Sequence, residues 1–196
     1  MEKLDFNKLN ETLYLDKLDN GLTICIIPSK KSKRYYAILS TKYGSRDIEF
    51  IPYNKKDYIK TNYGVAHFLE HKAFEMESGI DPFTYFAQSG TSANASTSFD
   101  ITKYYIWGVN KVYQNIDYLL TYVFSPYFTD SNIFKEQGII GEEIMMYEDE
   151  PSWILDDLTR RALFNELPFK EKIAGTKESI KMITKEELYD CFNTFY

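Results

Sequence analysis

The sequence has few cysteines and no long apolar run, and both shortages bear on where the protein works. Its two cysteines, Cys25 and Cys191, lie far apart and outside any metal-type spacing, which is typical of buried or free thiols in a reducing compartment. No stretch approaches the ~18 consecutive apolar residues of a membrane span. Residues 1–5 are charged and precede no apolar segment, so we expect no secretory signal. These features predict a cytoplasmic protein of bacterial type that does not associate with membranes.

Basic charge is also in short supply. The 196 residues include 23 Lys and Arg against 29 Asp and Glu, which gives a formal net charge of −6. The densest basic run, residues 30–34, is typical of a solvated hairpin turn and forms no stripe along the chain. A nucleic-acid partner is therefore not expected.

Apolar residues, by contrast, are plentiful. Hydrophobic residues make up 44% of the chain and aromatic residues 17%, which is enough for a folded core and excludes a disordered chain. The length suits one domain with a full core or two small packed halves. No internal repeat, low-complexity tract or linker-like change of composition divides the chain, so we expect a single domain over residues 1–196.

Apolar periodicity and turn residues predict strands at 22–28, 35–41, 93–99 and 104–109. They predict helices at 63–76, 82–88, 113–124, 130–147, 153–165 and 184–196. The first two strands are expected to pair across the basic turn. Asp130 or Ser131 would cap one helix, and Thr184 would open the last helix in a capping box. Strands interleaved with long helices indicate an α+β fold.

The two histidines of the chain, His67 and His71, fall four residues apart in a predicted helix. Residues at this spacing share a helical face, so the two imidazoles can bind one metal ion. Glu70 lies between them, where its carboxylate could act on a water held by that metal. Random placement would give this spacing in roughly one chain in a hundred, so the pair favours zinc hydrolysis.

A catalytic zinc ion takes three protein ligands and leaves a fourth position for water. With both histidines used and no suitable cysteine, the third ligand should be a carboxylate. The predicted helix at 130–147 offers Glu136, Glu142 and Glu143. Glu136 and Glu143 share one face, and Glu142 is rotated from Glu143 by about 100°. Spacing alone does not choose between Glu142 and Glu143.

Several motifs, in this order along the chain, resemble the pitrilysin/insulinase family of zinc metallopeptidases (inverzincins), which includes mitochondrial processing peptidase. His67 to His71 are similar to the inverted HxxEH zinc motif of that family. Further similar segments lie at residues 20–22, 44–46, 64–66, 92–95, 102–105, 136–144, 175 and 180. The resemblance spans nearly the entire chain and is nearest to two-halved bacterial members of greater length.

The resemblance implies a mostly antiparallel sheet with helices packed on one face. It also implies that His67, His71 and Glu143 hold Zn²⁺ and that Glu70 is the general base. Glu136 matches a second acidic position of the family's active site. The implied activity is a zinc-dependent endopeptidase acting on short or unfolded peptides.

The resemblance further implies how a peptide substrate is held. Asn94 and Ala95 match a strand whose backbone takes the peptide as an added β-strand. The chain ends at Tyr196, where the family has a further strand and then a second domain that forms part of the substrate chamber. We therefore expect a C-terminal half or a partner chain of the same family, and a homodimer stays open.

Two other interpretations stand beside the peptidase. A non-catalytic subunit that binds a partner or peptide could share the fold, although such subunits typically lose motif residues that are present here. S-ribosylhomocysteine lyase shares the inverted motif and adds a cysteine ligand, for which Cys191 lies far downstream. Without a metal, the histidine pair would simply be a hydrogen-bonded helix surface.

Overall fold

The structure is a computed structural model that describes residues 1–29 and 31–196, so Lys30 of the predicted basic turn lies outside the described residues. The chain divides into two units, Met1–Tyr35 and Tyr36–Tyr196. Each unit has its own sheet and is described by itself below.

The first unit is an antiparallel sheet of three strands, β1 (Glu2–Phe6), β2 (Glu11–Lys17) and β3 (Thr23–Ile26). β2 is the central strand, and Leu15 lies opposite Cys25 in its pairing with β3. The predicted strand at 22–28 therefore exists. Its predicted pairing with residues 35–41 is wrong, because those residues belong to the sheet of the second unit.

The sheet of the second unit has the order β4-β8-β7, from β4 (Tyr35–Thr41), β7 (Ser92–Thr97) and β8 (Thr102–Gly108). β7 and β8 are antiparallel, and β7 lies at the edge of the sheet. Side chains of β8 alternate, with Tyr104 and Ile106 buried and Trp107 39% exposed. One face of the sheet is thus covered and the other is not, as the period of two along a strand requires. A short pair, β5 (Glu49–Phe50) with β6 (Ile59–Lys60), completes the strands of the described chain.

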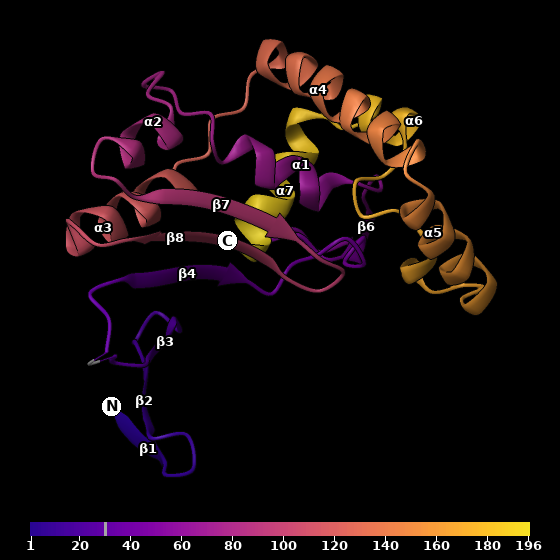
Figure 1. Cartoon of the computed structure of the whole chain (residues 1–196). Helices are drawn as coiled ribbons and strands as arrows, with labels where there is room; N and C mark the ends of the chain where they lie inside the picture. The colour runs from indigo at the N-terminus through magenta and orange to yellow at the C-terminus, as the bar shows by residue number, and fades with distance from the viewer. Residues whose placement is uncertain (30) are drawn as a thin grey trace. The chain divides into compact units, whose positions relative to one another are not determined.

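Helices cover the buried face of this sheet (Figure 1). α1 (Val65–Lys72) contacts β7 and β8, α2 (Pro82–Ala87) contacts β7, and α3 (Val112–Val123) contacts β8. α4 (Asp130–Glu148) and α7 (Lys185–Phe195) pack on α1, and α5 (Pro151–Leu163) and α6 (Lys177–Lys181) pack on α4. A 3₁₀ turn lies at Pro168–Lys170. The expected α+β fold is confirmed, and each predicted helix has a counterpart. The described residues include no helix long and apolar enough to cross a membrane.

Helix α1 lies at the centre of the second unit, in contact with β7, β8, α4 and α7. Its Phe68 and Leu69 pack with Ile140 and Ile144 of α4 and Leu188 of α7 in the main apolar cluster. Burial of such side chains is the dominant favourable contribution to folding. The core therefore fixes α1 and α4 against each other.

The start of α1 is fixed by a close backbone crossing. Gly64, the N-cap residue, has φ 95°, and a Cβ there would lie 2.6 Å from the carbonyl oxygen of Ala174. Gly175 has φ 75°, and a Cβ there would overlap the carbonyl oxygen of Tyr63. Both positions need glycine, because any other residue would be strained at positive φ and its Cβ would overlap the opposing backbone.

Two helix starts test the cap predictions. Thr184 caps α7 in the predicted capping box with Glu187. The cap of α4 is Thr129, which accepts from the backbone N–H of Asn132, and the predicted caps at Asp130 or Ser131 are wrong. Thr129 has the extended backbone that an N-cap requires, whereas Asp130 is already the first helical residue.

Candidate active site

Helix α1 presents both histidines to one cavity. His67 is 9% exposed and Glu70 is 8% exposed, while the side chain of His71 is 25% exposed. The two imidazole rings lie with their centroids 4.5 Å apart, as the spacing of four residues predicts. All three side chains line a cavity of about 570 Å³.

Helix α4 adds carboxylates to the histidine pair. Glu143 Oε1 lies 3.7 Å from His67 Nε2, and Glu143 Oε2 lies 3.4 Å from His71 Nε2. Glu136, two turns earlier, lies 2.9 Å from His71 Nδ1 through its Oε1. Glu142 is exposed, so Glu143, and not Glu142, is the one of the two that faces the histidines.

Ligand atoms of His67, His71 and Glu143 lie within 4.8 Å of one another. Two imidazole nitrogens and one carboxylate oxygen are a donor set found in catalytic zinc sites. The Nε2 atoms of both histidines face Glu143, and Glu136 accepts from His71 Nδ1–H, which fixes that ring. The residues therefore fit a zinc ion.

Without a metal, the three candidate ligands differ in how readily they would bind one: His67 and Glu143 carry no proton to release at neutral pH, whereas His71 does. Burial, with a smaller effect from charged His71, lowers the pKa of His67 to about 4, so His67 is neutral and has a free lone pair. Burial opposes charge on His71 too. Its hydrogen bonds to Glu136 and Glu143 outweigh this and raise the pKa of His71 to about 9. Burial also opposes charge on Glu143, but the hydrogen bond to His71 and the nearby histidines lower its pKa to about 2.

Glu70 faces the same cavity and is held by strand β7. Burial raises the pKa of its carboxyl group, and a hydrogen bond from the Thr97 hydroxyl partly offsets the rise. A buried carboxylate with a raised pKa beside a group of candidate metal ligands has the properties of a general base.

Asn94 and Ala95 lie on β7, the edge strand, and line the cavity with Thr97. The Asn94 side chain accepts from the Ala95 backbone N–H at 2.8 Å. The structure thus brings together every predicted site residue on α1, α4 and β7, with Glu136 reaching the cluster through His71.

Some residues that shape the site were not predicted. Tyr147 donates a hydrogen bond to Glu143, and it follows Glu143 by four residues, a helical spacing that could have indicated the contact. The Thr97 hydroxyl donates a hydrogen bond to Glu70, which lies 27 residues earlier in the sequence, and no local pattern indicates that contact.

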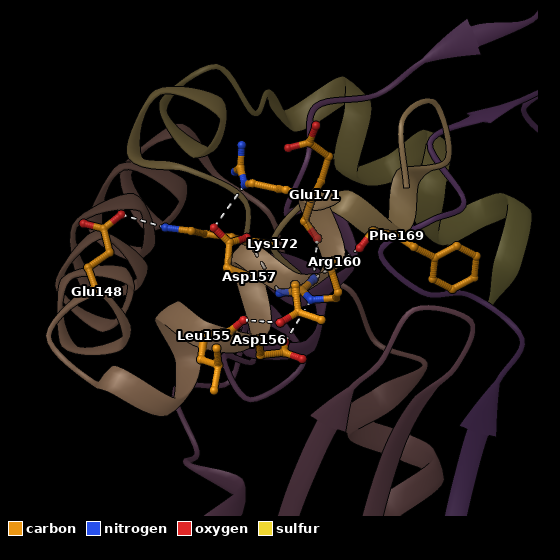
Figure 2. A network of polar contacts seen from close by, with 10 residues as sticks. Glu148, Leu155, Asp156, Asp157, Arg160, Phe169, Glu171 and Lys172 are labelled. Atoms are coloured by element: carbon orange, nitrogen blue, oxygen red, sulfur yellow. Dashed lines mark hydrogen bonds and ion pairs between the residues drawn. The ribbon is translucent and has the colours of Figure 1, made fainter. Parts of the chain in front are cut away.

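Much of the remaining wall of the cavity comes from α5 and the segment after it, and Figure 2 shows the polar contacts among these elements. Arg160 of α5 donates to the carbonyl oxygens of Phe169 at 3.3 Å and Glu171 at 3.0 Å. Lys172 pairs with Glu148 at the end of α4, with 2.8 Å between the charged atoms. These contacts join α4, α5 and residues 169–172 into one wall.

Cys191 does not belong to the site in the described structure. It is fully buried in the main apolar cluster, and burial raises the pKa of its thiol to about 12. The cavity is lined by other residues. Nothing in this placement supports the lyase interpretation.

Comparisons with known proteins show which family and fold the chain shares. A sequence profile described as "Insulinase (Peptidase family M16)" matches residues 59–177. The zinc protease YmfH of Bacillus subtilis (strain 168) is 44% identical over all of this chain and 46% of its own length. The crystal structure of an M16-like peptidase from Alicyclobacillus acidocaldarius is 38% identical with a TM-score of 0.91, over 98% of this chain and 44% of that one.

A more distant structure shares the fold alone. It is described as a peptidase M16 inactive domain from Pseudomonas fluorescens, and it is 15% identical with a TM-score of 0.75, over 92% of this chain and 42% of that one. In each of these comparisons the chain spans about half the length of the relative.

Proposed function

Because the chain belongs to the insulinase (peptidase M16) family, we propose that it hydrolyses peptide bonds with a zinc ion held by His67, His71 and Glu143. The observation that carries the proposal is the approach of three ligand atoms within 4.8 Å on two helices that the core fixes together. Buried Glu70 in the same cavity supplies the group that such a reaction needs beside the metal.

A zinc ion held by His67, His71 and Glu143 would lower the pKa of a water molecule and polarise the scissile carbonyl. Glu70 accepts the proton of the attacking water and later delivers a proton to the leaving amine. Thr97 orients the Glu70 carboxylate, and Glu136 orients the ring of His71. Tyr147 holds the Glu143 carboxylate towards the cluster.

Strand β7 gives a means of binding an extended peptide. Its position at the sheet edge leaves one side open to strand addition, with Asn94 and Ala95 beside the cavity. The Asn94 side chain would release the Ala95 N–H as the peptide arrives. Short or unfolded peptides suit this mode because their backbone N–H and C=O groups are not already paired within secondary structure.

Further parts of the proposal concern partners and compartment. The relatives are about twice as long, so we propose that a second half or a partner chain of the same family completes the substrate chamber, with homodimerisation as another route. The exposed free thiol of Cys25 fits the reducing cytoplasm of a bacterium.

A non-catalytic binding subunit is the second candidate. An inactive domain shares this fold, so the fold does not distinguish the two functions. The site residues favour the enzyme, because a subunit without catalysis has no need for Glu70 and a complete set of candidate metal ligands in one cavity.

The test measures bound zinc and peptide cleavage in the full chain and in matched variants. We expect about one zinc per chain, retained in Glu70→Gln and in Glu142→Gln, whose residue is exposed and lies outside the cluster. His67→Ala should lose the metal, and Glu70→Gln should lose cleavage. Full zinc loading of His67→Ala, or cleavage by Glu70→Gln, would contradict the proposal. A zinc-loaded chain that cleaves no peptide favours the binding subunit.

A further inference from the structure

Helix α3 carries a buried hydroxyl group that has no hydrogen-bond partner among the described residues. The group belongs to Tyr122, which lies in the last turn of α3 and is fully buried. Burying a hydroxyl without a partner costs free energy, because the group gives up its hydrogen bonds to water. Phenylalanine would fill the same space without this cost. We therefore expect the hydroxyl to serve a purpose other than packing.

Aromatic neighbours fix the ring of Tyr122. Its centroid lies 5.3 Å from that of Phe74, 6.0 Å from that of Phe86 and 6.3 Å from that of Tyr104. These rings come from the segment after α1, from α2 and from β8, the strand on which α3 packs (Figure 1). Packing from three elements sets the direction in which the hydroxyl points.

The same neighbours connect Tyr122 to Glu70, the proposed general base. Phe74 follows Glu70 by four residues, about one helical turn further along the chain. Tyr104 lies on β8, which pairs with β7, and Thr97 of β7 donates a hydrogen bond to Glu70. Tyr122 therefore packs against both parts of the chain that position the Glu70 carboxylate.

The phenol of Tyr122 also responds to the charge of that carboxylate. Burial raises the pKa of Tyr122 far above its usual range, and Tyr118 and Glu70 add to the rise. The phenol is therefore neutral and can donate a hydrogen bond. The carboxylate of Glu70 acts in the same direction on Tyr104, but the Tyr104 hydroxyl already pairs with the Tyr196 hydroxyl at 2.9 Å. Of these two buried tyrosines beside Glu70, Tyr122 is the one with an uncommitted hydroxyl.

We propose that the Tyr122 hydroxyl is a second positioning group for Glu70 and donates to its carboxylate through one bound water molecule. The inference rests on the proposed peptidase function and adds a residue of α3 to the groups that orient the general base. Buried waters commonly join polar groups that do not touch directly. The terminal torsion of a glutamate is only loosely restricted, so one hydrogen bond from Thr97 leaves the carboxylate free to rotate. A second hydrogen bond from another element holds it in one orientation.

The first test measures whether the two groups interact, and it does not depend on cleavage. Tyr122→Phe removes the hydroxyl alone, and Glu70→Gln removes the negative charge of its acceptor at nearly the same size. Urea unfolding of the full, metal-free chain, of both single variants and of the double variant gives the coupling between the two residues. We expect a coupling of at least about fivefold in the unfolding equilibrium constant.

A matched cycle on the same helix serves as the control. Tyr118 precedes Tyr122 by one turn, and its hydroxyl donates to the sulfur of Met76 at 3.4 Å. Tyr118→Phe removes the same atom from the same group of aromatic rings. Its coupling with Glu70→Gln should be near zero.

The second test measures peptide cleavage by the zinc-loaded chain. We expect Tyr122→Phe to lower kcat about tenfold with KM and bound zinc unchanged, because the orientation of a general base affects the chemical step and not substrate binding. Tyr118→Phe should keep the wild-type kcat. Circular dichroism confirms that each variant folds.

Distinct results overturn the positioning role and the parent proposal. A coupling no larger than that of the control cycle, or a wild-type kcat in Tyr122→Phe, overturns the role of the hydroxyl alone. Equal losses of kcat in Tyr118→Phe and Tyr122→Phe would assign the effect to aromatic packing and also overturn it. A wild-type chain that binds zinc but cleaves no peptide overturns the peptidase, and the positioning role then fails with it.

Discussion

Zinc binding should release about one proton from the chain at neutral pH, and that proton should come from His71. A histidine must be deprotonated at the nitrogen that binds a metal. The pKa of His71 in the metal-free chain is about 9, so at pH 7.5 the ring is almost fully protonated. His67 has a pKa of about 4 and Glu143 a pKa of about 2, and neither carries a proton to release. Two ordinary histidines, each with a pKa near 6.5, would together release only about 0.2 proton.

The assay is isothermal titration of zinc into the metal-free chain in several buffers of different ionisation enthalpy. The dependence of the observed heat on buffer enthalpy gives the number of protons released. The Glu136→Gln variant is the informative comparison, because it keeps a hydrogen-bond acceptor for His71 but removes the negative charge. We expect the release to fall by about half a proton or more in this variant. Protons that any other group releases are common to both proteins and cancel in the difference.

The sign of the pH dependence gives a second check on the same reasoning. The folded-state pKa of His71 is raised, so the proton is held below pH 9 and given up above it. The release from His71 should therefore decline as the pH approaches 9. Equal release from the wild type and Glu136→Gln, with Glu142→Gln as the control for loss of an exposed carboxylate, would refute the assignment of the proton to His71.

Three further substitutions test other contacts. Tyr147→Phe removes the hydrogen bond to the ligand carboxylate and should weaken zinc binding about tenfold in competition with a chelating dye; unchanged affinity would contradict that role. Gly175→Ala should lower the free energy of unfolding by about 2 kcal/mol or more in urea, because its Cβ meets the Tyr63 carbonyl. Gly79→Ala, at φ 70° but in open space, should cost less, and equal losses would exclude the steric cause. Thr184→Ala should cost about 1 kcal/mol in the same assay and Thr184→Ser much less; no difference between them would argue against the cap.

Local spacing predicted the parts of the site that lie on single helices. His67 and His71 are four positions apart and Glu136 and Glu143 are seven positions apart; each spacing predicts a shared helical face, which the structure confirms. The choice of Glu143 over Glu142 needed either the resemblance or the packing of α4 on α1. Helical geometry gives the relative directions of two side chains, but the direction of the core decides which of them faces inward.

Strand pairing was less accessible to sequence analysis. The turn after Pro28 suggested a hairpin between residues 22–28 and 35–41, yet β3 pairs with β2 and β4 lies in another sheet. The apolar run Leu13-Tyr14-Leu15, followed by the turn residues Asp19-Asn20-Gly21, could have indicated β2 as a hairpin partner of β3. Pairing between distant strands depends on long-range contacts that local patterns do not record.

The composition of the edge strand β7 affects the tendency of copies of the chain to associate through their sheets. An unpaired strand edge invites copies of the same chain to stack into growing sheets. β7 resists this through its composition, because Ser-Ala-Asn-Ala-Ser-Thr lacks the bulky apolar side chains that make dry interfaces between stacked sheets. The Asn94 side chain also occupies the Ala95 N–H within the same strand. An edge built in this way disfavours aggregation while it would stay available to the extended peptide proposed above.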